Sequence, residues 1–142
     1  MSEVITIETT VNRPIERIWE TWNEPRHIIH WGFASDDWHV PAAQNDLRVN
    51  GTFNYRMEAK DGSEGFDFSG VYTEIVPNKR IAYVLGDGRK VSIEFTEAGN
   101  ATKINQSFEA ENEYPPEYQK EGWQSILNNF KNYTETIEEL KY

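Results

Sequence analysis

The chain has 142 residues, with 14 Lys plus Arg against 24 Asp plus Glu and no cysteine. This length fits a single domain, residues 1–142, with a sizeable core, and the absence of thiols excludes disulfide bonds and thiolate chemistry. A formal charge of −10 would repel phosphate, so neither nucleic acid nor an anionic membrane surface is an expected partner. No apolar run reaches the ~20 residues of a membrane span and the N-terminus shows no secretion signal, so we expect a cytoplasmic protein.

Strand-like and helical patterns follow one another in the first forty residues. Residues 4–11 alternate between two faces, which predicts a half-buried strand. Apolar residues recur at helical spacing after Pro14, which predicts a short helix over 14–22. Residues 26–31 are expected to add one or two helical turns. The stretch 32–41 is irregular and polar, so we interpret it as a loop that acts as a lid over the mouth of any cavity.

About six sequential strands are expected between this loop and residue 110. The Asn50-Gly51 pair, the strongest short turn signal, leads into a hairpin strand at 53–59. A further strand covers 64–76, in which Gly70 allows a bulge or a close approach of another group. The remaining strands are predicted at 81–85, 91–95 and 104–110. Because the connecting turns are short, neighbouring strands should be antiparallel.

One apolar stripe defines the last predicted element, a helix over about residues 116–140. The spacing puts its apolar side chains on one helical face: Trp123, Ile126, Leu127, Phe130, Tyr133, Ile137 and Leu140. The pair Pro115-Pro116 suits its start, and at ~1.5 Å per residue the helix would be about 35 Å long. A one-faced sheet followed by one long amphipathic helix predicts an α+β packing.

Several short motifs, in a fixed order along the chain, are shared with a known family. They are Arg13-Pro14-Ile15-Glu16-Arg17-Ile18-Trp19, His30-Trp31, Asp46-Leu47-Arg48-Val49-Asn50-Gly51, Gly70-Val71-Tyr72, Pro77-Asn78-Lys79-Arg80-Ile81, and Gly122-Trp123 with Leu127. With them the chain resembles the START-like and birch-pollen-allergen-like (SRPBCC) superfamily and, within it, bacterial homologues of the activator of heat-shock protein 90 ATPase. The resemblance implies a helix-grip fold, in which a curved antiparallel sheet wraps around a long C-terminal helix and two short helices follow the first strand. The family usually has two adjacent glycines where this chain has Asn50-Gly51.

The helix-grip fold implies a cavity between the concave face of the sheet and the long helix. We expect its walls to be drawn from thirteen side chains: Trp38, Phe53, Tyr55, Met57, Phe66, Phe68, Tyr72, Tyr83, Phe95, Gln106, Trp123, Leu127 and Phe130. Apolar walls with a few polar tips are typical of small-molecule pockets. The same residues would also fill a solid core, so the sequence leaves both interpretations open.

Gln106 is the informative member of this set, because it is expected on the same strand face as Ile104 and Phe108. A buried amide needs hydrogen-bonding partners. Cavity water, a ligand or a neighbouring tyrosine hydroxyl could each supply them, and we favour the tyrosine.

Five possible metal ligands lie close together in the sequence: His27, His30, Asp36, Asp37 and His39. Imidazole with carboxylate suits zinc. The segment after His30 is irregular, however, and the chain has no cysteine and no His-Glu-x-x-His run. Surface histidines are the favoured interpretation, and we expect no metal or cofactor.

Candidates for acid–base catalysis are equally few. Asp67 and Glu94 would face a cavity only if the strands had the opposite register to the predicted one. Gly86-Asp87-Gly88 lacks the lysine and the strand-to-helix setting of a phosphate loop, so it predicts a hairpin turn. Asp46 and Arg48 share a strand face, and we expect them to form a structural ion pair.

Three classes of function remain. The favoured hypothesis is binding of a small hydrophobic or amphipathic ligand, lipid-like or polyphenol-like, in the cavity. The second, which the resemblance implies, is a co-chaperone-like interaction module with a filled core and a chaperone partner. The third is a cyclase- or hydrolase-like enzyme that uses a cavity acid, although the sequence assigns no catalytic residue.

Overall fold

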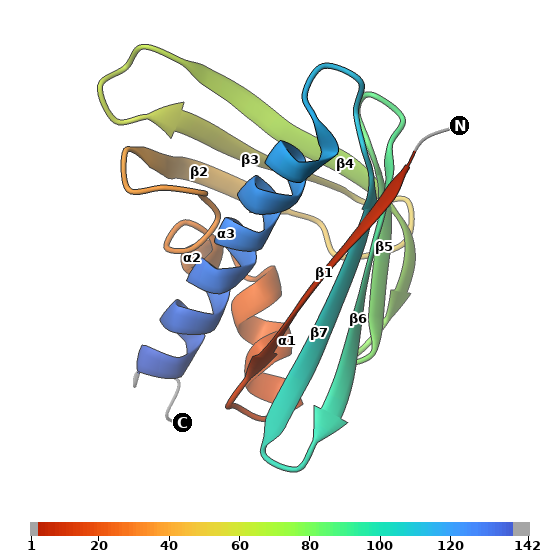
Figure 1. Ribbon diagram of the computed structural model, residues 1–142. Helices are drawn as coiled ribbons and strands as arrows, with labels where there is room; N and C mark the ends of the chain where they lie inside the picture. The colour runs from red at the N-terminus through yellow and green to blue at the C-terminus, as the bar shows by residue number, and fades with distance from the viewer. Residues whose placement is uncertain (1–2, 138–142) are drawn as a thin grey trace.

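The computed structural model describes residues 3–137, which form one seven-stranded sheet, two short helices and one long helix (Figure 1). In chain order the elements are β1 (Val4–Val11), α1 (Ile15–Asn23), α2 (Pro25–Ile28), β2 (Trp38–Asn45), β3 (Thr52–Ala59), β4 (Gly65–Val76), β5 (Arg80–Leu85), β6 (Lys90–Ala98), β7 (Ala101–Glu109) and α3 (Pro116–Thr136). The sheet order is β1-β7-β6-β5-β4-β3-β2, and every neighbouring pair is antiparallel. This is the predicted α+β helix-grip fold.

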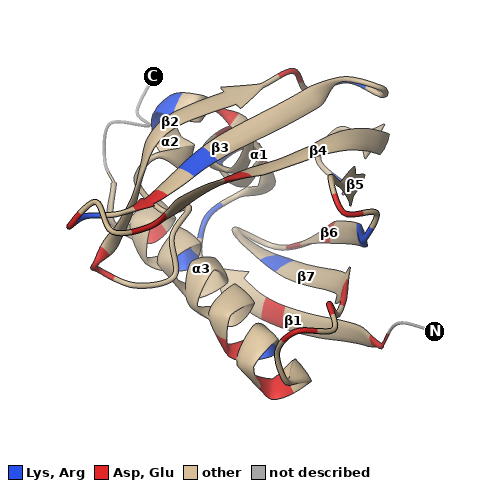
Figure 2. Cartoon of the chain, turned by 90° about the horizontal axis from the view of Figure 1, so that it is seen from above, with Lys and Arg blue, Asp and Glu red and all other residues tan. Residues whose placement is uncertain are grey.

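The sheet is strongly curved, and α3 closes its open side (Figure 2). The first strand lies beside the last in the sheet, and Ile7 of β1 pairs with Gln106 of β7. The helix α3 lies against β1, at one edge of the sheet, while β2 forms the opposite edge. A space is therefore enclosed between α3 and the strands at the far edge.

The short helix α1 fills one end of this space with aromatic side chains. The ring of Trp22 lies 5.1 Å from that of Trp31, 5.7 Å from that of Phe95 and 4.8 Å from that of Phe130. All four side chains are buried. Because α1 packs here against both the sheet and α3, the core is solid at this end of the molecule.

The prediction of a loop over 32–41 is wrong for its second half. Residues from Trp38 onward form β2, which pairs with β3, and only the stretch before Trp38 is irregular. The strand is hard to recognise because it lies at the sheet edge, contains Pro41 and has a register shift between His39 and Ala42. An edge strand tolerates proline and a bulge, and neither gives a clear alternating pattern.

The turn predicted at Asn50-Gly51 is present between β2 and β3. Asn50 has a φ of 71°, a left-handed conformation that asparagine tolerates, so it can replace the first glycine of the family pattern. A Cβ on Gly51 would lie 2.2 Å from the backbone oxygen of Asp46, so glycine is required there. The predicted pair of Asp46 and Arg48 forms within this exposed loop, with Nε 2.9 Å from the carboxylate.

The predicted long helix is present as α3. Its Leu127 and Phe130 are buried, while Trp123, Ile126 and Tyr133 are partly buried against the core. The helix ends at Thr136, and Ile137 follows in an extended conformation, so it does not extend the predicted helical stripe. Leu140 lies outside the described residues. Among residues 3–137, no helix is long and apolar enough to cross a membrane.

Candidate functional site

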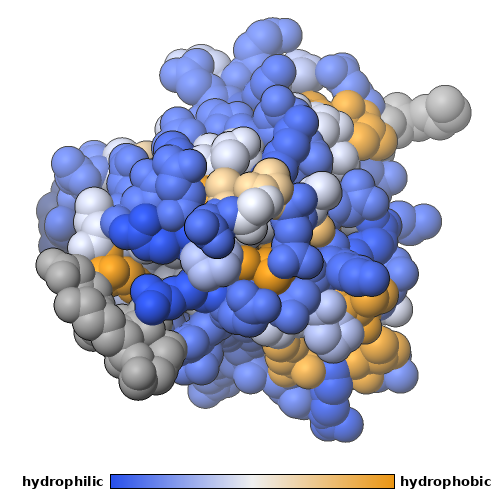
Figure 3. Space-filling view, turned by 90° about the horizontal axis from the view of Figure 1, so that it is seen from below, coloured by the Kyte–Doolittle hydropathy of each residue, from blue (hydrophilic) through white to orange (hydrophobic). Residues whose placement is uncertain are grey.

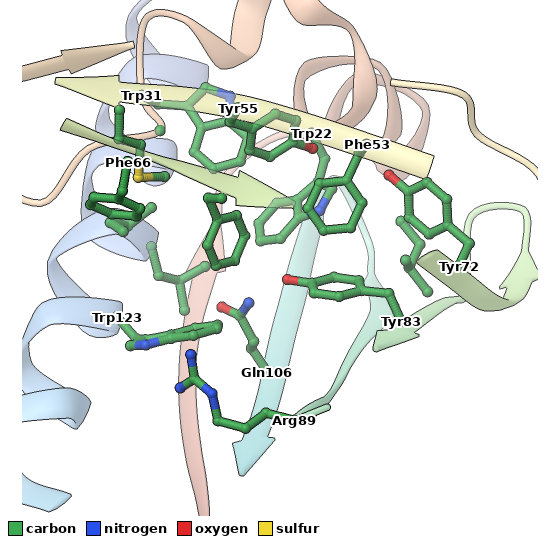
Figure 4. A pocket seen from close by; sticks show the side chains of 16 residues that line it. Trp22, Trp31, Phe53, Tyr55, Phe66, Tyr72, Tyr83, Arg89, Gln106 and Trp123 are labelled. Carbon is green, nitrogen blue, oxygen red and sulfur yellow. The ribbon is translucent and has the colours of Figure 1, made fainter. Parts of the chain in front are cut away.

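A partly enclosed pocket of about 240 Å³ lies between the concave face of the sheet and α3 (Figure 4). Ten of the thirteen predicted wall residues line it: Phe53, Tyr55, Met57, Phe66, Phe68, Tyr72, Tyr83, Gln106, Trp123 and Leu127. They come from β3, β4, β5, β7 and α3. Their alternation along the strands places them on the inner face, as the sequence predicts.

Three predicted wall residues do not line the pocket. Phe95 and Phe130 belong to the solid end of the core, where the rings of Trp22 and its neighbours cover them. Trp38 lies on the edge strand β2, where its ring is 5.8 Å from that of Phe66. The prediction placed all inward residues around one cavity, whereas α1 divides the space into a packed part and an open part.

The structure adds six lining residues that the prediction did not include: Trp22, Trp31, Gly32, Ile81, Arg89 and Ile126. Five of them are apolar or glycine and lie on predicted apolar stripes or beside them. Arg89 has no such signal, because it follows a hairpin turn and precedes a strand.

Stacked aromatic rings form the wall beneath α3. The indole of Trp123 stacks on Phe108, with ring centroids 4.0 Å apart and planes 10° from parallel. The ring of Phe68 meets the same indole edge-on at 5.9 Å. These contacts fix the orientation of Trp123, so one face of the pocket is flat and rigid.

Tyrosine hydroxyls and one amide provide polar groups within these walls. Burial raises the pKa of Tyr55 and of Tyr83 well above the ordinary value, and it raises the pKa of Tyr72 to about 12. All three hydroxyls are therefore protonated at neutral pH. The hydroxyl of Tyr72 donates to Oδ1 of Asn45 at 2.5 Å.

Gln106 lines the pocket beside Tyr83, and its side chain acts to lower the pKa of the tyrosine, against the larger effect of burial, which raises it. The tyrosine favoured from the sequence is therefore a neighbour of the buried amide, and a hydrogen bond between them stays a prediction. Figure 4 shows the amide directed into the pocket, between Tyr83 and Trp123.

Arg89 is the one charged residue among the described residues that line the pocket. It stands immediately before β6, and its side chain is 22% exposed. The guanidinium Nε donates to Oδ2 of Asp87 at 2.8 Å. Figure 4 shows the rest of the guanidinium beside Trp123 and Gln106.

Within residues 3–137, no Asp, Glu or His lines the pocket. Asp67 and Glu94 both lie exposed on the outer face, where they form ion pairs with Arg56 and Arg80. The strand register is the predicted one, so neither carboxylate enters the pocket. The enzyme hypothesis thereby loses the cavity acid on which it depended.

The five possible metal ligands predicted between residues 27 and 39 do not come together. His27 is buried, with Nδ1 2.7 Å from the Tyr133 hydroxyl, and His30 stacks on the same tyrosine ring. Asp36 and Asp37 are exposed.

Among the described residues, a different group has ligand atoms close enough for a metal ion: Glu20, Glu24 and His27. The guanidinium of Arg26 lies 2.7 Å from both of these carboxylates. A cation of the chain itself therefore already compensates their charge.

Comparison with known proteins places this architecture in a family. The family model described as Activator of Hsp90 ATPase homolog 1-like protein matches residues 12–135. The solution structure of the AHSA1-like protein from Aeromonas hydrophila has 42% identity and a TM-score of 0.89, over 94% of this chain and 92% of that one. A solution structure from Cytophaga hutchinsonii has 54% identity and a TM-score of 0.81, over 97% and 96%.

A crystal structure from Nitrosomonas europaea, with 17% identity and a TM-score of 0.78 over 92% of each chain, shares the fold. No curated protein matches this chain. The family match covers all the elements that build the pocket, and the two nearer structures extend over nearly the whole length. The chain therefore belongs to the family of Activator of Hsp90 ATPase homolog 1-like proteins, within the SRPBCC superfamily.

Proposed function

We propose that the protein binds a small, largely apolar molecule in the pocket between the sheet and α3. The observation that carries this proposal is the pocket itself, an apolar space of about 240 Å³ that the surrounding aromatic side chains leave open. Protein interiors are otherwise close-packed, and an unfilled apolar space forgoes dispersion contacts. A ligand that fills the space would regain them.

The size of the pocket restricts the ligand. An apolar cavity of roughly 150 Å³ accommodates a single benzene ring. The space of about 240 Å³ therefore suits a molecule of one or two rings, or a short aliphatic chain, and is too small for a whole membrane lipid. The flat wall of Trp123, fixed on Phe108, favours a planar ligand that stacks on it.

Titration with a neutral two-ring probe, 2-naphthamide, tests the proposal. Backbone amide chemical shifts should change at lining positions from several elements, such as Tyr55, Gln106 and Trp123, and a saturable binding curve should follow. Leu127→Trp should abolish these changes, because Leu127 lines the pocket and a larger ring would occupy it. The same change at Val71, which is exposed and outside the pocket, should leave binding intact.

Leu127 is buried, so overpacking is expected to cost about 1–3 kcal/mol of stability. Ile126→Trp is a second variant, since Ile126 lines the pocket but is only partly buried. A well-dispersed amide spectrum establishes that each variant is folded. Undiminished 2-naphthamide binding by both folded variants, or no binding by the natural sequence, would contradict the proposal.

A chaperone partner is the second candidate, and the family description, which names an Hsp90 ATPase activator homologue, supports it. On the face shown in Figure 3, hydrophobic residues are scattered among hydrophilic ones, so a partner there would meet mostly polar groups. This candidate predicts that purified bacterial Hsp90 perturbs exposed residues and that its ATPase rate changes. Leu127→Trp should not alter that effect, whereas it should abolish 2-naphthamide binding.

A further inference from the structure

The charge inside the pocket is opposite to the charge of the whole chain. The chain carries 24 acidic against 14 basic side chains, yet the part of the pocket lining that the structure describes includes one arginine and no acid. Acidic residues are distributed over most of the strands and helices (Figure 2). A lone cation in an otherwise apolar pocket provides a specific point of attachment for an anion.

The guanidinium of Arg89 is only partly satisfied by the chain. Its Nε is bound to Asp87, at 2.8 Å, but within residues 3–137 no acceptor is recorded for either Nη nitrogen. Figure 4 shows these nitrogens beside Trp123 and Gln106, on the pocket side of the residue. Arginine has five donors in a planar fork, and the pair of Nη groups can hold two oxygens of one planar anion.

Partial burial makes this cation stronger as a binding group than an arginine on the surface. The side chain is 22% exposed, so a bound anion would interact through a medium less polar than bulk water, while water still reaches the group when the pocket is empty. The amide of Gln106 lies at the same wall and offers two further donors. An anionic head would thus meet Arg89 and Gln106 while its apolar body lies against Trp123.

We propose that the ligand of this pocket is a small organic carboxylate, whose carboxylate group binds Arg89 and whose one- or two-ring or short aliphatic body fills the aromatic pocket. This inference rests on the proposed ligand-binding function and specifies the class of ligand. A carboxylate matches the fork of the guanidinium in shape and charge, and a neutral molecule of the same size does not.

A matched pair of probes tests the inference: 2-naphthoate and its neutral analogue 2-naphthamide, compared by isothermal titration calorimetry. The natural sequence should bind the acid at least tenfold more tightly than the amide. Arg89→Gln should lower the affinity for 2-naphthoate tenfold or more and change the affinity for 2-naphthamide less than threefold. Arg89→Lys, which keeps the charge without the fork, should retain part of the preference.

Two further variants serve as controls. Arg80→Gln removes an arginine that pairs with Glu74 and Glu94 on the outer face, and it should leave both affinities unchanged. Asp87→Asn removes the carboxylate that pairs with Arg89 in the protein. The affinity for 2-naphthoate should therefore rise, and the affinity for 2-naphthamide should not change.

The outcomes separate the two proposals. Equal affinity for both probes, or an unchanged preference for the acid in folded Arg89→Gln, would overturn the carboxylate inference and leave the ligand-binding function standing. Absence of binding for both probes at millimolar concentration would overturn the ligand-binding function, and the carboxylate inference with it.

Discussion

At Gly70 the inner face of β4 lacks a side chain, and the ring of Phe53 from β3 occupies the space. A Cβ added at Gly70 would lie 2.8 Å from Phe53 Cε2 and 2.8 Å from the backbone oxygen of Val84. The ring of Phe53 in turn contacts those of Tyr55, Phe68, Tyr72 and Tyr83, all of which line the pocket. Because Gly70 has no Cβ, the Phe53 ring can lie against the strand, and this ring positions a large part of the aromatic wall.

Gly70→Ala should therefore destabilise the protein by about 1–3 kcal/mol, because neither the ring nor the strand backbone can move away cheaply. Gly122→Ala is the matched control with the opposite expected sign. Gly122 lies inside α3 with nothing within 4 Å of an added Cβ, so alanine should stabilise the helix by about 0.5–1 kcal/mol. Urea unfolding measures both changes. An unchanged free energy of unfolding in Gly70→Ala would show that the sheet can relax around the methyl group.

One aromatic side chain of α3 packs against both of the preceding helical regions. Phe130 is fully buried, and its ring meets those of Trp22 and Trp31 edge-on at 4.8 and 4.9 Å. These two rings come from α1 and from the segment after α2, so Phe130 joins all three helical regions. About one and two turns earlier, Leu127 and Trp123 face the pocket instead. A single helix face therefore supplies both the anchor and the pocket wall.

Phe130→Ala should cost about 3–5 kcal/mol of stability, the usual result of removing a buried ring and leaving a cavity. Tyr118→Ala serves as the comparison, because Tyr118 lies on the same helix with 71% of its surface exposed and should change stability by about 0.5 kcal/mol or less. Chemical denaturation gives both values. A small loss of stability in Phe130→Ala would mean that Trp22 and Trp31 move into the space left by the ring.

Across the whole molecule, Glu135 near the end of α3 connects this helix to the segment that follows β1. Its Oε2 accepts a hydrogen bond from the backbone N–H of Asn12, at 2.8 Å, and another from Lys131 Nζ, at 2.7 Å. Arg13 also donates to the backbone oxygen of Glu135. Burial acts to raise the pKa of Glu135, but these donors and the positive charges of Lys131 and Arg13 outweigh it and lower the pKa below its ordinary value.

A pKa that is lower in the folded state stabilises the protein above the ordinary value of 4.5, and this contribution is lost as the pH falls through the folded-state value. Glu135→Gln should therefore be less stable than the natural sequence by about 1 kcal/mol at pH 7, and the difference should shrink as the pH falls below 4.5. Urea unfolding between pH 7 and pH 3 measures it. Glu113 is exposed, and its side chain makes no hydrogen bond or ion pair with any of residues 3–137, so Glu113→Gln should show no such trend. If the stability difference between Glu135→Gln and the natural sequence stays constant with pH, the charge of Glu135 does not stabilise the fold.

Most of the fold could be predicted from local patterns. The alternation at 4–11 and 53–59 predicted β1 and β3, and the stripe from Trp123 to Phe130 predicted the buried face of α3, because both patterns repeat with the period of their own element. The strand β2 could not be predicted, since an edge strand with a proline and a register shift has no such period. At Gly70 the sequence left a bulge or a close approach open: the close approach is present, and the register shift of β4 lies further along, at Thr73.

Which side chains face inward follows from local patterns, because the strand and helix periods fix the orientation of each residue relative to its own element. Which of these side chains meet depends on how the elements pack together. The tertiary structure placed α1 so that Phe95 and Phe130 are covered and the pocket begins at Trp22, and it brought Arg89 from the turn before β6 to the side of Trp123 in α3. The reason is physical: the positions of helices against a curved sheet depend on the packing of all the side chains at once, and no local period encodes them.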